Sequence, residues 1–285
     1  MHLPKLPINS VLPDLKNALR SGSAILAAPP GSGKTTIVPL ALLEERWLLD
    51  KKIVILEPRR LATRAAAARM ATLLGEAVGQ TIGYQIRFDR QVSPTTRIEV
   101  VTEGILTRRI QEDNELQDTG LIIFDEFHER SIHADLALAL CLDLCQLRED
   151  LRILVMSATL DTGPIAELLG KVPVVTGKGE AHSVRIDYLP HQVTGRIATT
   201  TAAGIRRVCK EHPGDILTFL PGAGEIKDVA RQLNDDPGID KTIIAPLYGN
   251  LSQKEQDQAI MPDPDGRRRI ILSTSIAETS LTIEG

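Results

Sequence analysis

Three uninterrupted apolar runs limit what this chain can fold into more than any other feature. The runs IVIL (53–56), LIIF (121–124) and ILVM (153–156) contain no polar residue. A strand with one side facing solvent alternates polar and apolar residues, whereas a continuous apolar run indicates a strand covered on both faces. Segments of helical length lie between the runs, so the sequence predicts a parallel α/β sheet wrapped by helices.

The same strand–helix alternation extends from residue 23 to residue 169. We expect strands at 23–28, 52–57, 81–87, 97–102, 121–125 and 152–157. We expect helices near 34–46, 59–74, 103–112, 133–147 and 162–169. Together these elements predict a first α/β domain that spans residues 1–180.

The alternation of strand and helix patterns is interrupted between residues 172 and 190. A polar, glycine-rich stretch at 177–180 precedes VRIDYL (184–189), whose alternation is typical of another strand. A second α/β domain is expected over 190–285, with strands at 215–220, 242–246 and 269–274 and helices near 196–211, 223–234 and 253–261. Three strands make a half-sheet with an unpaired edge. We therefore expect the second domain to be incomplete and the chain to be a fragment of a longer protein.

Charge and composition exclude few functions. The formal net charge of −4 shows no global basic field of the kind that attracts nucleic acid. A protein can still carry positive charge locally in a groove, so nucleic-acid binding stays open. Aromatic residues make up only 3% of the chain, which argues against recognition built mainly on base stacking.

The cysteines and the N-terminus bear on the compartment. Cys141, Cys145 and Cys209 form no close pairing motif, and an odd count favours a reducing environment. Cys141 and Cys145 would share a helix face, but no partner pair for a metal site is nearby, so we expect them to pack as small apolar side chains. The N-terminus lacks a signal-peptide core, and no run approaches the ~20 apolar residues of a membrane span. We expect a cytoplasmic protein.

The segment APPGSGKT (28–35) follows one predicted strand and opens a helix, which is the setting of a phosphate-binding P-loop. Gly31 and Gly33 permit a tight turn in which backbone N–H groups converge on phosphate oxygens at the positive end of the helix. Lys34 is expected to reach the β- and γ-phosphates of ATP, and the Thr35 hydroxyl to ligate Mg²⁺. The alternative is a glycine-rich turn that only caps a helix. The expected nucleotide-binding residues are Pro30, Gly31, Ser32, Gly33, Lys34, Thr35 and Thr36.

An acidic pair, Asp125 and Glu126, follows the apolar run 121–124. In a P-loop domain an Asp at such a strand end holds Mg²⁺, largely through water, and a neighbouring Glu can polarise the attacking water as general base. We therefore assign Asp125 to the metal and Glu126 to the base, and we place His128 and Lys34 with them in the catalytic set. The alternatives are a helix N-cap with solvated charge for the pair and an ordinary helix-start residue for His128.

Seven ordered motifs resemble those of superfamily 2 helicases of the DEAH branch, and the resemblance covers nearly the whole chain. Within that branch, the opening segment is most similar to the bacterial HrpB-type helicases. The motifs are APPGSGKT (28–35), EPRRLA (57–62), TEGIL (102–106), DEFH (125–128), SAT (157–159), FLPG (219–222) and TSIAETSLT (274–282).

The resemblance implies a P-loop NTPase with two RecA-like domains in tandem. It implies that ATP and Mg²⁺ bind between these domains, that a single-stranded nucleic acid, RNA in preference to DNA, binds across both, and that ATP hydrolysis drives 3′ to 5′ movement or unwinding. Glu278 would face the cleft between the domains. The implied nucleic-acid contacts are Arg59, Arg60, Thr102, Gly104, Thr274, Thr279 and Ser280.

The resemblance also implies more specific roles. Ser157 and Thr159 would link hydrolysis to domain movement; the alternative for them is a capped turn. Arg69 is placed like an arginine that covers the adenine in this family; the alternative is an exposed arginine on a helix surface. Phe127 departs from the branch pattern, which has Ala there, so nearby packing must accommodate a ring. The arginine-finger motif of the family would lie beyond Gly285, so we expect this chain alone to hydrolyse ATP very slowly.

Two other functions stay open. A P-loop kinase or switch ATPase would show no stimulation by RNA or DNA, and the motifs at 157–159 and 274–282 argue against it. An ATP-gated clamp would retain nucleotide and nucleic acid without turnover, and the Asp125–Glu126 pair argues against it for the parent protein.

Overall fold

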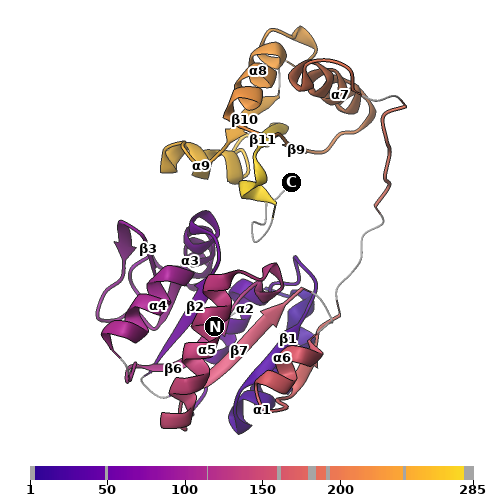
Figure 1. Cartoon of the computed structure of the whole chain (residues 1–285). Coiled ribbons are helices and arrows are strands. Elements are labelled where there is room, and N and C mark those ends of the chain that lie inside the picture. The colour runs from indigo at the N-terminus through magenta and orange to yellow at the C-terminus, as the bar shows by residue number, and fades with distance from the viewer. Residues whose placement is uncertain are drawn as a thin grey trace. The chain divides into compact units, whose positions relative to one another are not determined.

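The chain forms two compact units, Met1–His182 and Ser183–Gly285 (Figure 1). The computed structural model describes residues 4–48, 51–113, 115–158, 162–178, 184–190, 193–239 and 242–278. Each unit is built on its own parallel or mostly parallel sheet with helices packed on it, which confirms the predicted α/β class.

The sheet of unit 1 has eight strands in the order β4-β3-β5-β2-β6-β7-β1-β8. All described neighbours are parallel except β3 and β4, which form an antiparallel edge. The strands are β1 (Ala24–Ala27), β2 (Lys52–Glu57), β3 (Ile82–Ile86), β4 (Asp89–Gln91), β5 (Ile98–Thr102), β6 (Thr119–Phe124), β7 (Arg152–Ser157) and β8 (Val174–Thr176). The helices are η1 (Pro7–Val11), α1 (Leu12–Ser21), α2 (Lys34–Leu42), α3 (Arg60–Leu74), α4 (Glu103–Glu112), η2 (Phe127–Glu129), α5 (Ile132–Leu147) and α6 (Gly163–Leu168).

Helices cover both faces of this sheet, and this explains the continuous apolar runs. Ile53 and Ile55 of β2 pack in the cluster that includes α1, α2 and α3. Their neighbours Val54 and Leu56 point the other way, into the cluster that includes α4 and α5. All four side chains are buried. Successive residues of the run 53–56 therefore face two different apolar layers, and no position in that run is left for a polar side chain facing solvent.

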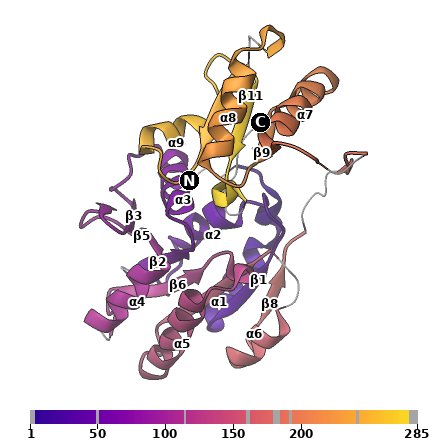
Figure 2. The ribbon, with the colours of Figure 1, turned by 45° about the horizontal axis from the view of Figure 1, so that its top comes forward.

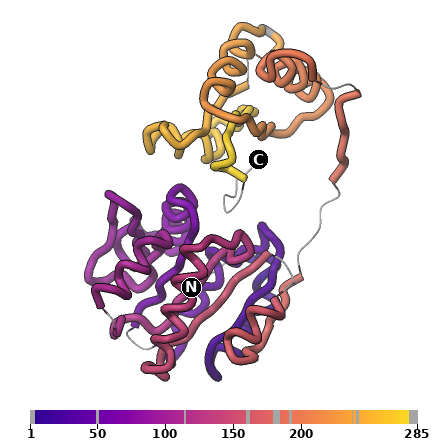
Figure 3. The backbone as a smooth tube through the Cα atoms, viewed as in Figure 1, coloured from indigo at the N-terminus to yellow at the C-terminus, as the bar shows by residue number. Residues whose placement is uncertain are grey.

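Unit 2 has a three-stranded parallel sheet in the order β10-β11-β9. Figure 2 shows α7 and α8 side by side, and Figure 3 traces this unit from orange to yellow. The buried Arg269 of β11 donates hydrogen bonds to Asp215 at 2.7 Å and to the carbonyl of Met261 at 2.6 Å, so it joins β11 to the segments before β9 and after α9. The elements are α7 (Ile197–Glu211), β9 (Ile216–Phe219), α8 (Ala223–Asn234), η3 (Pro237–Ile239), β10 (Ile243–Leu247), α9 (Gln253–Ile260), β11 (Arg269–Ser273) and η4 (Ser275–Ala277).

One predicted strand is wrong, and one helix is shorter than expected. VRIDYL (184–189) is not a strand, and Ile186 and Tyr188 are 70% and 86% exposed. Its alternation suits a strand, but a strand also needs a neighbour to accept and donate backbone hydrogen bonds, and no described strand pairs with it. The helix expected to reach residue 46 ends at Leu42. The other predicted elements end within two residues of their expected bounds, whereas α1, β4 and β8 were not anticipated.

Candidate active site

Five neighbouring strands of unit 1 bring the sequence motifs to one edge of the sheet. Strands β5, β2, β6, β7 and β1 are adjacent and parallel, so their carboxyl ends lie together. In open α/β sheets, ligands bind at this edge. The loops there carry the P-loop after β1, Arg59 after β2, Thr102 at the end of β5, Asp125 after β6 and Ser157 at the end of β7.

The P-loop has the backbone that its glycines allow. Gly31 and Gly33 have φ angles of +73° and +93°, in the left-handed region that favours glycine. The helix α2 begins at Lys34, so its positive end lies at the loop. The N–H group of Ala28 donates to the Ser157 carbonyl at 3.0 Å, which ties the start of the loop to β7. This arrangement suits an anion held by backbone N–H groups.

The P-loop lysine contacts the proposed base. Lys34 Nζ lies 2.8 Å from Oε1 of Glu126, and both side chains are buried. Glu126 has φ +48°, a conformation that is strained for a residue other than glycine and that is concentrated at functional sites. The two residues are 92 positions apart in the sequence, so only the sheet brings them together.

His128 links this pair to the SAT motif. Its Nδ1 lies 3.3 Å from Oε2 of Glu126 and also 3.3 Å from the backbone nitrogen of Ala158. A ring nitrogen either donates or accepts, so Nδ1 can bond only one of these partners at a time. His128 thus lies between the Glu126 carboxylate and the end of β7, and its Nδ1 is within reach of either one.

Asp125 lies beside these residues and is suited to a metal. It is 4% exposed, and burial raises its pKa to about 6 with help from the Glu126 charge, whereas Lys34 and a hydrogen bond from Thr35 oppose the rise. Its Oδ1 accepts the N–H of Glu126 at 2.8 Å. Its Oδ2 is buried and lacks a hydrogen-bonding partner among the residues that the structure describes. A carboxylate and a hydroxyl are oxygen donors of the kind Mg²⁺ prefers, so Asp125 and Thr35 fit that ion.

The ring of Phe127 is accommodated in the core. Phe127 is 3% exposed and packs edge-on against Phe124, with 5.9 Å between the ring centroids. The guanidinium of Arg130 lies over the Phe127 ring, 5.6 Å from its centroid. The residue that departs from the family pattern is thus packed in the core of unit 1.

The predicted nucleic-acid residues of unit 1 lie at the same edge, where β2 leads into α3 and β5 leads into α4. Arg59 Nη2 is 3.5 Å from Oε2 of Glu129, and Arg60 donates to the Arg87 carbonyl at 3.2 Å. Thr102 is the N-cap residue of α4 and is half-buried, and Gly104 in the first turn of that helix is exposed.

Two features of this edge were missed from the sequence. The Ser131 hydroxyl donates to Oε1 of Glu103 at 2.6 Å and accepts the N–H of Ala134 at 3.0 Å, so it caps α5 and joins it to the start of α4. A serine directly before a helical stretch is an N-cap signal that could have identified it. Phe88 is 89% exposed in the β3–β4 turn with φ +68°, and its neighbour Arg87 stacks on its ring; nothing in the sequence pattern marks it.

The remaining predicted residues lie on α3, in unit 2 or outside the described part of the chain. Arg69 is exposed on α3, and Thr274 follows β11 of unit 2, where its N–H donates to the Leu247 carbonyl at 3.2 Å. Thr159, Thr279 and Ser280 lie outside the described residues.

The cysteines show no metal site. Cys141 is buried, its pKa is raised by burial, and no group of three or more potential ligands that could hold a metal occurs in the described part of the chain. No helix in the described ranges has the length and apolar character needed to cross a membrane.

Known proteins resemble this chain in sequence and in structure. HrpB of Escherichia coli (strain K12), an ATP-dependent RNA helicase, is 49% identical over 99% of this chain and 35% of its own length. HrpA of Borreliella burgdorferi, also an ATP-dependent RNA helicase, is 37% identical over 98% of this chain and 34% of its own length. A crystal structure of the E. coli DEAH/RHA helicase HrpB has a TM-score of 0.90 and 48% identity, and covers 99% of this chain and 36% of that chain.

The chain spans about a third of the length of these relatives. Residues 200–285 match the helicase conserved C-terminal domain. Residues 11–168, more than half of the sequence, match the DEAD/DEAH box helicase family, and the chain belongs to that family.

Proposed function

We propose that this chain is the ATP-binding and ATP-hydrolysing core of a helicase or translocase that acts on RNA in preference to DNA. The observation that carries the proposal is the 2.8 Å contact between Lys34 of the P-loop and Glu126, beside the unpartnered buried oxygen of Asp125. The relatives named above as ATP-dependent RNA helicases support both the use of ATP and the choice of RNA. We further propose that the protein works in the cytoplasm.

In the proposed reaction, Lys34 leaves Glu126 and bonds the β- and γ-phosphates of ATP. The backbone N–H groups of the loop 31–35 hold the phosphate oxygens. Thr35 and Asp125 would hold Mg²⁺, which neutralises charge that develops on the phosphates. Glu126, released from Lys34, orients a water molecule and accepts its proton. Because Lys34, Asp125 and Glu126 are buried, their electrostatic interactions are stronger than they would be in bulk water.

In the proposed complex, the protein binds the single-stranded nucleic acid mainly through its phosphates. Arg59, Arg60, Thr102 and Gly104 would contact the backbone of the nucleic acid, so binding would depend on salt and only weakly on base sequence. We propose Arg69 as the residue that covers the adenine. Ser157 and Thr159 would couple hydrolysis to movement, and Thr274, Thr279 and Ser280 would contact the strand from unit 2.

The side chains of unit 1 offer a route for such coupling. Arg59 is paired with Glu129, which follows the acidic motif, and Glu103, beside Thr102, is bonded to Ser131 at the end of the same loop. Both proposed strand-contacting loops are therefore joined by side chains to the segment that begins at Glu126.

Glu126→Gln tests the role of the base. Glutamine keeps the size of the side chain and removes the charge that accepts the proton. In the longer parent protein, we expect the single-turnover rate of ATP hydrolysis to fall by roughly 10²–10⁴-fold, while a fluorescent ATP analogue still binds. A variant that hydrolyses ATP at the wild-type rate would remove Glu126 from this role.

ATP turnover by the longer parent protein, measured with RNA, with single-stranded DNA and without nucleic acid, tests the substrate. We expect RNA to give the largest stimulation. Turnover that neither strand changes would indicate a P-loop kinase or switch ATPase. Nucleotide and RNA retained without any hydrolysis would indicate an ATP-gated clamp.

A further inference from the structure

The first described residues of the chain pack directly on the P-loop. The N–H group of Ile8 donates to the Ser32 carbonyl at 3.1 Å, and the Ile8 side chain is fully buried. A Cβ placed on Gly33 would lie only 2.6 Å from Cδ1 of Leu6 and 3.3 Å from its Cβ. Leu6 therefore lies against the backbone of Gly33. The two residues that precede Lys34 are each contacted by this segment.

The same segment is fixed at the far end of the P-loop helix. The half-turn after α2 carries Glu45, which is 8% exposed and pairs with Lys16 Nζ at 3.2 Å and Arg20 Nε at 3.1 Å. Both cations belong to α1. We call residues 4–21 the N-terminal brace, because they contact both the loop that precedes α2 and the segment that follows it.

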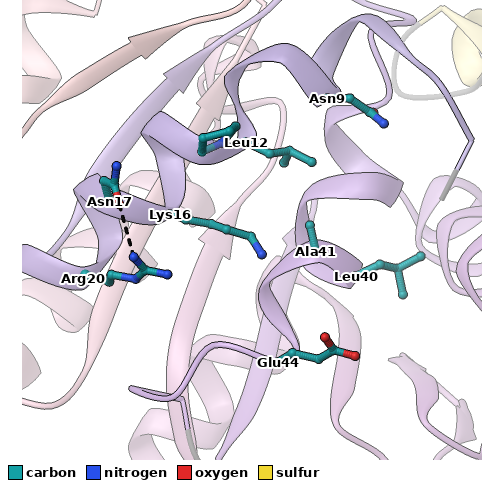
Figure 4. Close-up of a pocket in the computed structure, with 9 residues that line it drawn as sticks. Asn9, Leu12, Lys16, Asn17, Arg20, Leu40, Ala41 and Glu44 are labelled. Atoms are coloured by element: carbon teal, nitrogen blue, oxygen red, sulfur yellow. Dashed lines mark hydrogen bonds between the residues drawn. The ribbon is translucent and has the colours of Figure 1, made fainter. Parts of the chain in front are cut away.

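A pocket of about 530 Å³ lies between the brace and α2, and Leu12, Lys16, Leu40 and Glu44 are among the residues that line it (Figure 4). The brace contacts the phosphate-binding loop through Leu6 and through the Ile8 N–H group. Leu6 and Leu12 are both half-buried leucines of the brace packed on the same core cluster, but only Leu6 meets Gly33.

We propose that Leu6 and Ile8 are positioning residues that hold Ser32 and Gly33 in the phosphate-binding conformation. Glycine has no side chain to restrict its backbone, so a loop that depends on Gly33 at φ +93° needs a neighbour to hold it there. Leu6 covers that backbone, and the Ile8 N–H group fixes the preceding carbonyl. If the loop leaves this conformation, the apparent affinity for nucleotide falls in proportion to the fraction of molecules that remain competent. This inference rests on the proposed nucleotide site.

Leu6→Ala and Leu12→Ala form a matched pair for the test. Both remove the same atoms from the brace, but only Leu6→Ala releases Gly33. Titration of the 285-residue chain with a fluorescent ADP analogue and Mg²⁺ measures Kd. We expect Leu6→Ala to raise Kd at least about fivefold, and Leu12→Ala and the conservative Leu6→Met to stay within about twofold of the wild type. A Kd for Leu6→Ala no higher than that for Leu12→Ala would overturn the proposal.

Hydrogen exchange gives a second measurement that does not depend on nucleotide. The backbone amides of residues 31–34 should exchange faster in Leu6→Ala than in Leu12→Ala when the two variants are compared under conditions that give them the same free energy of unfolding. Equal exchange in the two variants would show that Leu6 does not hold the loop. A wild-type chain that binds no nucleotide would refute the proposed function, while the exchange comparison would still decide the role of the brace.

Discussion

Asp125→Asn should stabilise the metal-free protein, and increasingly so as the pH rises. The pKa of Asp125 is raised from 3.8 to about 6, chiefly by burial. The folded state therefore binds this proton more tightly than the unfolded state. Stability falls as the pH rises through the window between these two pKa values, and it stays lower above the window. Asparagine carries no charge at any pH, so the variant lacks this loss.

The magnitude follows from the two pKa values. Raising the pKa of Asp125 from 3.8 to about 6 corresponds to about 3 kcal/mol of lost stability once the carboxyl group is fully ionised. About half of this loss, roughly 1 kcal/mol, develops between pH 5.0 and pH 7.5. The stability of Asp125→Asn relative to wild type should increase by that amount over this interval and level off above pH ~7.

Urea unfolding followed by tryptophan fluorescence measures this difference. Trp47 is the single tryptophan of the chain and lies in unit 1, where Arg152 stacks on its ring at 4.2 Å. The buffers should contain EDTA so that no divalent ion occupies the site. Asp14→Asn, an exposed aspartate at the start of α1, serves as the control and should show no such rise.

A relative stability that does not change with pH would refute the reasoning. It would mean that Asp125 is as easily ionised in the folded state as in the unfolded chain. Asp125 would then not be a desolvated carboxylate whose Oδ2 lacks a hydrogen-bonding partner. The argument that this residue fits Mg²⁺ would lose its physical basis.

Two further substitutions test the loops around the site. Arg60→Ala should weaken binding of a labelled RNA, measured by fluorescence anisotropy, about equally for all sequences, and it should lower the slope of log K against log salt by about one. The control Arg108→Ala, which changes an exposed residue of α4, should leave this slope unchanged. An equal slope for the two variants would exclude a phosphate contact by Arg60. Ser131→Ala removes the cap on Ala134 and the bond to Glu103, so urea unfolding should show a loss of about 1 kcal/mol, whereas a variant as stable as the wild type would contradict the capping role.

The parallel sheet and the main motifs could be read from local patterns. The runs 53–56, 121–124 and 153–156 are strands buried on both faces, as their continuous apolar character indicates. The spacing of Gly31, Gly33 and Lys34 between a strand and a helix indicated the P-loop, because the two glycines permit the left-handed backbone that the turn adopts. Parallel strands also place their carboxyl ends together, so Asp125 was expected near the P-loop before its contacts were known.

Other predictions failed where a local pattern had no tertiary partner. VRIDYL (184–189) has the alternation of a strand, yet no neighbour pairs with it in the described part of the chain. The converse holds for β8 (Val174–Thr176), which is too short to stand out in the sequence and is a strand because β1 pairs with it. Strand formation is decided by the neighbour as much as by the segment itself.

The sequence by itself determined which segments could be strands, which turn could hold phosphate and which carboxyl groups could serve it. The tertiary structure decided that Lys34 meets Glu126, that Ser131 meets Glu103 and that Leu6 lies on Gly33. Backbone preference and apolar spacing act over a few residues and are visible in the order of amino acids. Contacts between distant side chains depend on strand order and on how the layers pack, and these are fixed only when the whole sheet forms.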